Sequence, residues 1–531
     1  MPPNIVRFVS DDTSEKMLGY GGGDVLTPHI DAIGRNGVIF DSFHCPSTVC
    51  MASRYAALTG HYCGRCPTES FRRNYPSNAP YSVAFNTHVL PGVESTIGHV
   101  LQNAGYRTGY VGKWHTGPGE SELGVNWFEP YDDPRDPETA DKLLEHQQRV
   151  CEQVRATGFD YAGGISWGNP QPGDRQIREL EVHNLEWMTD SALEFIDESA
   201  KRDGPFFLNY AVTPIHGNGH IESLMSDPRI TPEGYREEHL GCMPPRPTIY
   251  ERIIDAGLPF DYITAGALWM DDAIGMVVKR LRELGVEENT IIIYSSDHGP
   301  CEDKGTVYQG GVRIPCVLQW KEKVPANRHV TAMAQNIDWL PTLAEAAGAD
   351  LPDDMVTDGK SLMPVLTGER ADLPGREDMY FEHGYSRGLR TKRWKYISWR
   401  LPDEIIDQMK SGQQDRACNH SGSFRDIATC LTVERHPDFF QPDQLYDLVA
   451  DPEEEHNLAD DPAYADVLEA MQDRLRTYLE SFDNPFPLDD VPDYMTSEEF
   501  HELARPYSSR DGMDELLWWT RKWHHRPEDV V

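Results

Sequence analysis

The 531-residue sequence predicts an α/β fold, with a mostly parallel central sheet flanked by helices and a smaller C-terminal α+β domain that carries an antiparallel sheet. Short apolar runs alternate with amphipathic segments along most of the chain, which is the pattern of strands connected by helices. Charged residues directly follow several of these runs, as they do at the carboxyl ends of parallel strands. A chain of this length can bury one large core and a smaller second one.

Strands are expected where apolar, β-branched or aromatic residues follow one another between turn residues. Such runs occur at 5–9, 37–40, 106–111, 205–212 and 290–295. Helices are expected where apolar residues recur with a helical period, namely from Thr27 onward and at 95–104, 184–201 and 268–284. Pro28 suits a first helical turn, and Gly105 and Gly285 suit helix ends because glycine readily adopts the left-handed conformation found there.

Three segments are expected: a catalytic α/β domain at 1–372, a C-terminal subdomain at 373–482 and an extension at 483–531. The subdomain is predicted to contain a hairpin at 388–397 and an amphipathic helix at 464–481. The extension includes Trp518, Trp519 and Trp523, which would be costly to expose, so we expect it to pack on the body or on a neighbouring subunit of a homo-oligomer. Residues 62–92 and 118–180 show few regular patterns and are predicted to form a pocket rim.

Composition excludes several classes of partner. The chain has 49 basic and 87 acidic residues, a net charge of −38, so nucleic acid is not an expected partner. No apolar run is long enough to predict a membrane span. We expect a cytoplasmic protein if the chain is complete, and a periplasmic or secreted one if a signal peptide has been removed.

Two pairs among the ten cysteines have a suggestive spacing. Cys63 and Cys66 have the spacing of a redox or zinc motif, but no second Cys or His pair lies nearby in the sequence, so neither role is favoured. Cys418 and Cys430 could pair with each other.

The most informative segment is 49–60, VCMASRYAALTG, where Cys50 opens a predicted helix and Arg54 follows one turn later. A helix start directs free N–H groups and the positive end of the helix dipole toward whatever lies there. A cysteine in that place is suited to chemistry on an anion. Taken alone, the segment is equally compatible with a buried structural cysteine.

Charged or imidazole side chains follow four predicted strands. In chain order they are Asp11 and Asp12, Lys113 and His115, His216, and Asp297 and His298. In open α/β sheets ligands bind at the carboxyl ends of the strands, so these residues are expected to share one site with Cys50.

These residue types suit one kind of chemistry. Asp11, Asp12 and Asp297 offer hard oxygen ligands for a divalent cation, and His298 can add a nitrogen or a hydrogen bond, a set that suits calcium, magnesium or manganese better than zinc. The cationic side chains of Arg54, Lys113 and Lys304 would surround a small tetrahedral anion. The sequence therefore predicts hydrolysis at a charged tetrahedral centre.

The segment around Cys50 resembles the motif of the sulfatase family, within the alkaline-phosphatase-like superfamily. In that family the pattern is Cys-x-Pro-Ser-Arg or Cys-x-Ala-Ser-Arg followed by Leu-Thr-Gly, and here Ala52 replaces the commoner proline. The resemblance implies that a maturase oxidises Cys50 to formylglycine, whose hydrated aldehyde is the nucleophile, and that Arg54 holds this hydrate.

The resemblance extends residue by residue to the other motifs. It implies a calcium site, with magnesium or manganese as alternatives, formed by Asp11, Asp12, Cys50, Asp297 and His298, the last standing where many members have Asn. Lys113 and Lys304 resemble the family's sulfate-binding lysines. His115 resembles the histidine that helps release sulfate, and His216 resembles a substrate contact that can act as a general acid. The segment from Lys304 to Pro315 is close to the family pattern, with Gln309 in place of Glu, and a common closing segment is matched near 445–458.

We therefore expect a sulfatase that acts on a small anionic sulfate ester, either a sulfated saccharide or an aryl sulfate. The first alternative is a phosphonate monoester or phosphodiester hydrolase of the same superfamily. The second is a non-catalytic anion-binding relative in which Cys50 stays a thiol.

Overall fold

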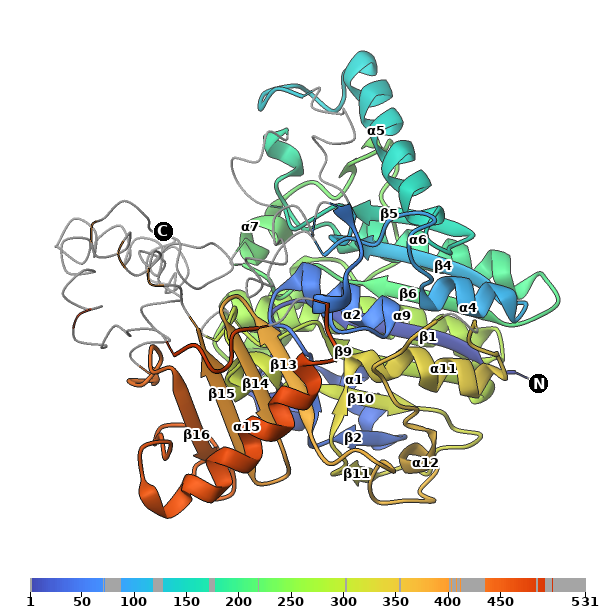
Figure 1. Cartoon of the computed structure of the whole chain (residues 1–531). Coiled ribbons are helices and arrows are strands. Elements are labelled where there is room, and N and C mark those ends of the chain that lie inside the picture. The colour runs from blue at the N-terminus through green and yellow to red at the C-terminus, as the bar shows by residue number, and fades with distance from the viewer. Residues whose placement is uncertain are drawn as a thin grey trace.

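The central element of the fold is a twisted sheet with helices on both faces (Figure 1). The structure, a computed structural model, describes residues 2–69, 71, 87–117, 128–170, 177–217, 219–300, 303–352, 355–400, 403, 407, 411, 435–483, 486–491 and 499. Within them the large sheet has eight strands, which from edge to edge are β11 (Arg328–Val330), β2 (Val38–Phe40), β10 (Cys316–Gln319), β9 (Thr290–Ser296), β1 (Asn4–Ser10), β6 (Phe206–Ala211), β4 (Arg107–Lys113) and β5 (Tyr161–Ser166).

The sheet is mostly parallel, as predicted. Strand β10 runs antiparallel to β2 and β9, whereas the other pairings in this sheet are parallel. The carboxyl ends of β1, β9, β6 and β4 therefore meet along one edge of the sheet, where the site is expected.

Strand β1 shows why both faces of the sheet are covered. Its side chains alternate between two cores, with Ile5 and Val9 in one and Val6 and Phe8 in the other. The first core is closed by helices α2 (Cys50–Thr59), α4 (Ile97–Asn103), α5 (Pro137–Arg155) and α11 (Trp339–Ala347). The second is closed by α1 (Pro28–Arg35), α6 (Leu185–Ala200), α8 (Pro247–Asp255) and α9 (Tyr262–Glu283). Full burial of each such apolar side chain contributes about 1.5–3 kcal/mol, which fixes the strand in the middle of the domain.

A second, antiparallel sheet follows in the chain, coloured orange in Figure 1. Its strands are β13 (Met379–His383), β14 (Ser386–Arg390), β15 (Trp394–Trp399) and β16 (Asp443–Asp447), and helix α15 (Ala465–Leu479) packs beside them. The predicted hairpin corresponds to β14 and β15. Leu475 of α15 belongs to the same apolar cluster as Ile5 of β1, so the small sheet shares a core with the large one.

The remaining elements are short. They are β3 (Phe43–His44), β12 (Ala334–Gln335), β7 (Ile230–Thr231), β8 (Gly234–Tyr235), α7 (His220–Met225), α10 (Gln309–Val312), α12 (Met363–Leu366) and the 3-10 turns η1 (Glu15–Met17), η2 (Gly19–Gly21), η3 (Cys63–Arg65), η4 (Arg178–Leu180), η5 (Glu287–Asn289), η6 (Asn336–Asp338) and η7 (Pro462–Tyr464).

Two sequence-based expectations need correction. Residues 118–180 were expected to be irregular, yet they contain α5 and the edge strand β5. Helix α5 has few apolar residues, so its helical period is weak in the sequence. Gly163 and Gly164 interrupt the apolar run of β5, so this strand is also hard to recognise from sequence. The helix predicted at 268–284 begins at Tyr262, because Asp261 and Thr264 form a capping box ahead of the apolar stripe.

Part of the C-terminal extension can be placed. Phe486 and Leu488 are buried in the first core, and the carbonyl of Leu488 accepts a hydrogen bond from Arg400. The aromatic residues at 518, 519 and 523, like Cys418 and Cys430, lie outside the described residues, and the three-segment division stays a prediction. None of the helices described in the structure is both long and apolar enough for a membrane crossing.

Candidate active site

The polar residues that follow the central strands meet at one edge of the sheet, as the sequence predicted. Asp11 and Asp12 follow β1, Asp297 follows β9, and Lys113 is the last residue of β4. The loop after β6 is joined to β1 by two backbone hydrogen bonds, from Asp11 N to Pro214 O at 3.3 Å and from Ile215 N to Asp11 O at 3.0 Å. This pairing brings His216 over the end of β1.

Cys50 is the first residue of helix α2 and is 4% exposed. Its Sγ atom lies 3.4 Å from Oδ1 of Asp11, 3.2 Å from Nε2 of His298 and 3.6 Å from Nζ of Lys304. The sulfur thus touches residues from three separate parts of the chain. Since α2 is buried along its whole length, its first residue is held firmly at this junction.

Arg54 lies one helical turn after Cys50, on the same side of α2. Its Nη2 atom is 3.0 Å from Asp11 Oδ2, and its Nε donates to Asp297 Oδ2 at 3.0 Å. The side chain is 3% exposed, so the guanidinium joins two buried carboxylates without competition from bulk water. Burial lowers the pKa of Arg54, but these carboxylates outweigh it and raise the pKa above its ordinary value.

Two lysines complete the positive charge of the site. Lys113 forms a buried ion pair with Asp11, and Nζ of Lys304 lies 2.9 Å from Asp12 Oδ1. Burial would raise the pKa of Asp11, but the neighbouring cations, Lys113 first among them, hold it well below the ordinary value. The carboxylate is therefore charged, and the site is a compact set of buried ions of both signs.

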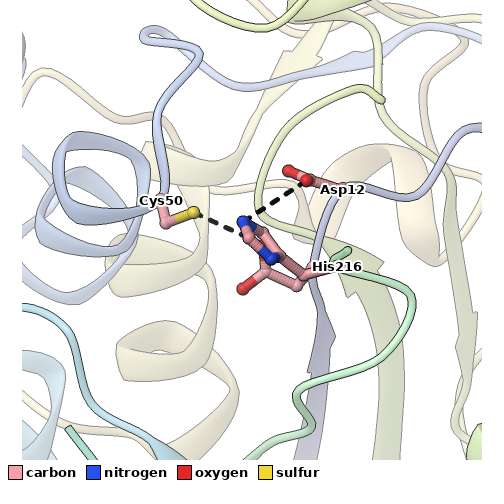
Figure 2. Close-up of side chains that lie close together, drawn as sticks. Asp12, Cys50 and His216 are labelled. Carbon is pink, nitrogen blue, oxygen red and sulfur yellow. Dashed lines mark hydrogen bonds and ion pairs between the residues drawn. The ribbon is translucent and has the colours of Figure 1, made fainter. Parts of the chain in front are cut away.

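His216 and His115 are the other two histidines of the site, and both are held in the neutral form in the free protein. Figure 2 shows His216 between Cys50 and Asp12, and its Nε2 atom is 3.5 Å from Asp12 Oδ2. Burial and the charge of Lys304 lower the pKa of His216 well below its usual range. His115 lies beside the cluster against the ring of Trp167, and burial together with the charge of Lys113 lowers its pKa in the same way.

The backbone is strained at two of these positions. Asp12 and His115 have φ angles of 51° and 50°, in the left-handed region that residues other than glycine seldom adopt. Such a conformation costs on the order of 1 kcal/mol and persists only where the surroundings impose it.

The donor set suits a hard divalent cation. Asp11, Cys50, Asp297 and His298 offer ligand atoms that all lie within 4.8 Å of one another, and a second such group exchanges the last two for Asp12 and His216. Donors at about 2.3–2.6 Å from one calcium ion would be separated by no more than about twice that distance. The Nδ1 of His298 donates to Gly299 O at 2.8 Å, which directs Nε2 toward Cys50 and Asp12. Burial lowers the pKa of His298, but Asp297 and other neighbours outweigh it and raise the pKa to about 9, so a metal ion would take the place of the proton on Nε2.

Several residues that support the site had no signal in the sequence. Thr48 Oγ1 donates to Thr306 O at 2.7 Å and Gly305 N donates to Thr48 O at 3.1 Å, which joins the loop before Cys50 to the loop of Lys304. Asn336 Nδ2 donates to Ser53 Oγ at 2.8 Å. Each partner is distant in sequence, so only the tertiary structure could reveal these contacts.

The Cys63 and Cys66 motif lies just beyond α2. Both thiols are free, and Cys63 Sγ donates to Ala52 O at 3.2 Å. Burial raises the pKa of the Cys63 thiol well above its usual range and that of Cys66 to about 11. Since the thiolate is the reactive form, these surroundings do not favour a redox role.

An open α/β sheet that gathers buried cations and carboxylates around a helix N-terminus is the architecture of a hydrolase for charged tetrahedral groups. The chain belongs to the sulfatase family, because the Sulfatase family model matches residues 3–349. Sulfatases are sulfuric ester hydrolases, and this protein is therefore an enzyme of that class. A model described as N-sulphoglucosamine sulphohydrolase, C-terminal, matches residues 297–425.

Named relatives and a solved structure agree with this family. Arylsulfatase A of Homo sapiens is 29% identical over 517 residues, covering 89% of this chain and 86% of the relative. N-acetylgalactosamine-6-sulfatase of Mus musculus is 27% identical over 404 residues, covering 70% and 68%. A structure in complex with its substrate D-glucosamine-2-N,6-O-disulfate is similar in fold, with a TM-score of 0.58 at 20% identity over 92% of this chain and 100% of that one.

Proposed function

We propose that this enzyme hydrolyses the sulfate ester of a sugar or of an aryl alcohol, with a formylglycine derived from Cys50 and a bound calcium ion. The observation that carries the proposal is the position of Cys50 Sγ, within 3.6 Å of Asp11, His298 and Lys304 at the start of a buried helix. A group at this position faces both the candidate metal ligands and the cations that would hold an anion.

The residues around Cys50 suit the binding of a sulfate group. Lys113 and Lys304 would each place an ammonium against a sulfate oxygen, and Arg54 would hold the hydrate formed at position 50. These cations are buried and already fixed by carboxylates, so they need little reorganisation when charge develops in the transition state. A cation held by Asp11, Asp12, Asp297 and His298 would add a Lewis acid to the same oxygens.

Once Cys50 is oxidised, formylglycine supplies the oxygen nucleophile for attack on sulfur. His216 is proposed to take up a proton when the anionic sulfate ester binds beside it, because a nearby negative charge favours the charged imidazole, and then to give that proton to the departing alcohol oxygen. Its side chain is 18% exposed, so it can exchange a proton with solvent. His115 is proposed to accept a proton at position 50 when sulfate is released. Both roles need imidazoles that point into the site, as His216 does in Figure 2.

The organic part of the substrate is supported by the relatives, which include an arylsulfatase and a sulfatase of an amino sugar. The charged residues around Cys50 would bind the sulfate group and do not by themselves select the organic part of the substrate. Because this cluster would hold a phosphonate or a phosphodiester by the same electrostatic means, hydrolysis of such esters is the alternative that an experiment must exclude.

The decisive experiment is to express the chain with and without a formylglycine-generating maturase. The tryptic peptide that ends at Arg54 should carry an aldehyde, trapped as a hydrazone, only with the maturase, and sulfate ester hydrolysis should follow the aldehyde content. Cys50→Ala should be inactive, whereas Cys63→Ser serves as a control in a neighbouring buried thiol. A fully active preparation with an unmodified thiol at position 50 would refute the proposed nucleophile, and faster turnover of phosphodiesters than of sulfate esters would favour the alternative.

A further inference from the structure

The loop between β6 and α7 carries His216 and needs support from outside itself. Its first part is held by the backbone bonds to Asp11, but beyond His216 the chain passes through Gly217, with a φ of 73°, and Gly219. Glycine loses more conformational freedom on folding than other residues, so this part of the loop is costly to fix in one conformation. Contacts with neighbouring elements must fix it.

His183, which precedes helix α6, touches both ends of this loop. Its Nδ1 atom lies 2.8 Å from Oγ1 of Thr213, three residues before His216. Its ring stacks on that of His220, four residues after His216, with centroids 4.8 Å apart and planes 18° from parallel. The backbone N of His183 also donates to Ser223 Oγ at 3.0 Å, so its position is fixed relative to α7.

His220 acts in this arrangement as a flat apolar surface. It is fully buried, and in the described part of the chain neither of its ring nitrogens has a hydrogen-bond partner. Its ring is nearly parallel to that of Tyr262, with centroids 6.3 Å apart. Burial of an unpaired polar ring is unfavourable, so the contribution of His220 lies in its shape and not in its nitrogens.

We propose that His183 is a positioning residue for His216. It sets the distance between the imidazole of His216 and the departing oxygen by holding Thr213 through a hydrogen bond and His220 through ring stacking. The proposal rests on the proposed function, in which His216 gives a proton to the leaving group. His183 itself is 4% exposed and takes no part in the proton transfer.

The proposal predicts an effect that depends on the leaving group. Proton donation matters more when the departing oxygen is a poor leaving group, so 4-nitrophenyl sulfate and phenyl sulfate, which are similar in shape, should respond differently. His216→Ala should lower kcat/KM for phenyl sulfate at least about tenfold more than for 4-nitrophenyl sulfate. His183→Phe keeps the stacked ring but loses the bond to Thr213. It should also lower kcat/KM more for phenyl sulfate than for 4-nitrophenyl sulfate, and the logarithm of this selectivity should be about one third to one half of that for His216→Ala.

A second variant approaches the same contact from its other side. Thr213→Val should reproduce the selective loss of His183→Phe, and the double variant should be no worse than either single one, because both remove one shared interaction. His220→Phe keeps the stacking surface and serves as the matched control, with kcat/KM within about twofold of wild type for both substrates.

The outcomes separate the two hypotheses. If His216→Ala shows the leaving-group dependence but His183→Phe and Thr213→Val lower both substrates equally, His183 only stabilises the fold and the inference is wrong. If His216→Ala itself shows no dependence on the leaving group, the proposed role of His216 fails, and the inference fails with it. Thr213→Val also tests the proposal if His183→Phe does not fold.

Discussion

Nε of Arg54 donates to Oδ2 of Asp297 at 3.0 Å, and this bond joins the helix that begins at Cys50 to the end of strand β9. The same guanidinium reaches Asp11 at the end of β1, so one side chain sets the position of the nucleophile helix against two adjacent strands. Because all three side chains are buried, the contact is both a structural tie and part of the electrostatic field at position 50.

Replacing Arg54 by Lys should therefore affect both stability and activity. A lysine keeps the charge but cannot bind two carboxylates through one planar fork. We expect a loss of about 3–5 kcal/mol in unfolding free energy and a fall in kcat of on the order of 10²-fold or more. Chemical denaturation and steady-state kinetics measure the two effects.

Arg65→Lys is the matched control for this variant. Arg65 lies shortly after the same helix and pairs with Asp358 at 2.8 Å, but its side chain is 25% exposed. A more exposed pair contributes about 0–1 kcal/mol, so the control should stay close to wild type. Equal effects of the two substitutions would contradict the special role assigned to Arg54.

Metal content should depend on Asp297. We expect Asp297→Asn to lose bound calcium and activity, and chelation of wild-type protein to lower Tm until calcium is restored, because a ligand that binds only the folded state stabilises it. Elemental analysis and thermal unfolding provide the measurements. Asp451→Asn is a control, since Asp451, Glu455 and His456 form a more exposed group of possible ligands away from the site. Normal calcium content and turnover in Asp297→Asn would show that the metal assignment is wrong.

The salt dependence of kcat/KM should reflect two opposed effects on an anionic substrate: attraction by the buried lysines of the site and repulsion by the negatively charged protein surface. The whole chain has a net charge of −38, whereas Lys113 and Lys304 lie buried at the site. Salt screens long-range repulsion more than buried contacts, so kcat/KM for an anionic sulfate ester should rise or stay constant from low to moderate salt. Initial rates measured at a series of salt concentrations give kcat/KM and test this prediction. A steep fall would instead indicate a basic approach surface and a polyanionic substrate.

Within the same site, Lys113→Ala should lower kcat/KM by on the order of 10²-fold or more at every salt concentration, because a cation aimed at developing charge is lost. Lys142→Ala on helix α5 is a suitable control, since Lys142 pairs with Glu138 on an exposed helix surface. A loss in Lys113→Ala that disappears at high salt would indicate that Lys113 acts only through long-range attraction.

Glu94 should make stability depend on pH. Its carboxyl accepts a hydrogen bond from Tyr55 of α2, its other oxygen has no partner in the described structure, and burial raises its pKa from 4.5 to about 7. The folded protein then binds the proton more tightly than the unfolded chain. The stabilisation is present in full below about pH 4.5 and is lost as pH rises through about 7.

Glu94→Gln removes this titration and should reduce the difference in unfolding free energy between pH 5 and pH 8, by on the order of 3 kcal/mol at most. Denaturant unfolding at the two pH values measures it, with Glu152→Gln on the exposed side of α5 as a control. An unchanged pH dependence in Glu94→Gln would mean that the carboxyl is already ionised in the folded protein.

The alternation of strands and helices was predictable because it depends on local periods in the sequence. The runs that became β1, β6 and β9 are mostly apolar and almost entirely buried, as expected for strands covered on both faces, and only Arg7 in β1 and Asn209 in β6 interrupt the apolar runs of those two strands. The antiparallel strand β10 and the paired glycines in β5 were not anticipated, since the direction of a strand and an interrupted run depend on its neighbours in the sheet.

The identities of the candidate site residues followed from the sequence alone, because the resemblance around Cys50 and the charged residues after four strands mark the site without knowledge of the third dimension. Parallel strands bring their carboxyl ends together, so Asp11, Lys113 and Asp297 had to be neighbours. Only the tertiary structure decided how these charges are paired, that Arg54 joins two carboxylates, and that His183 touches both ends of the loop of His216. These contacts join residues far apart in the chain, and their geometry depends on how helices pack against the sheet, which no local pattern of residues encodes.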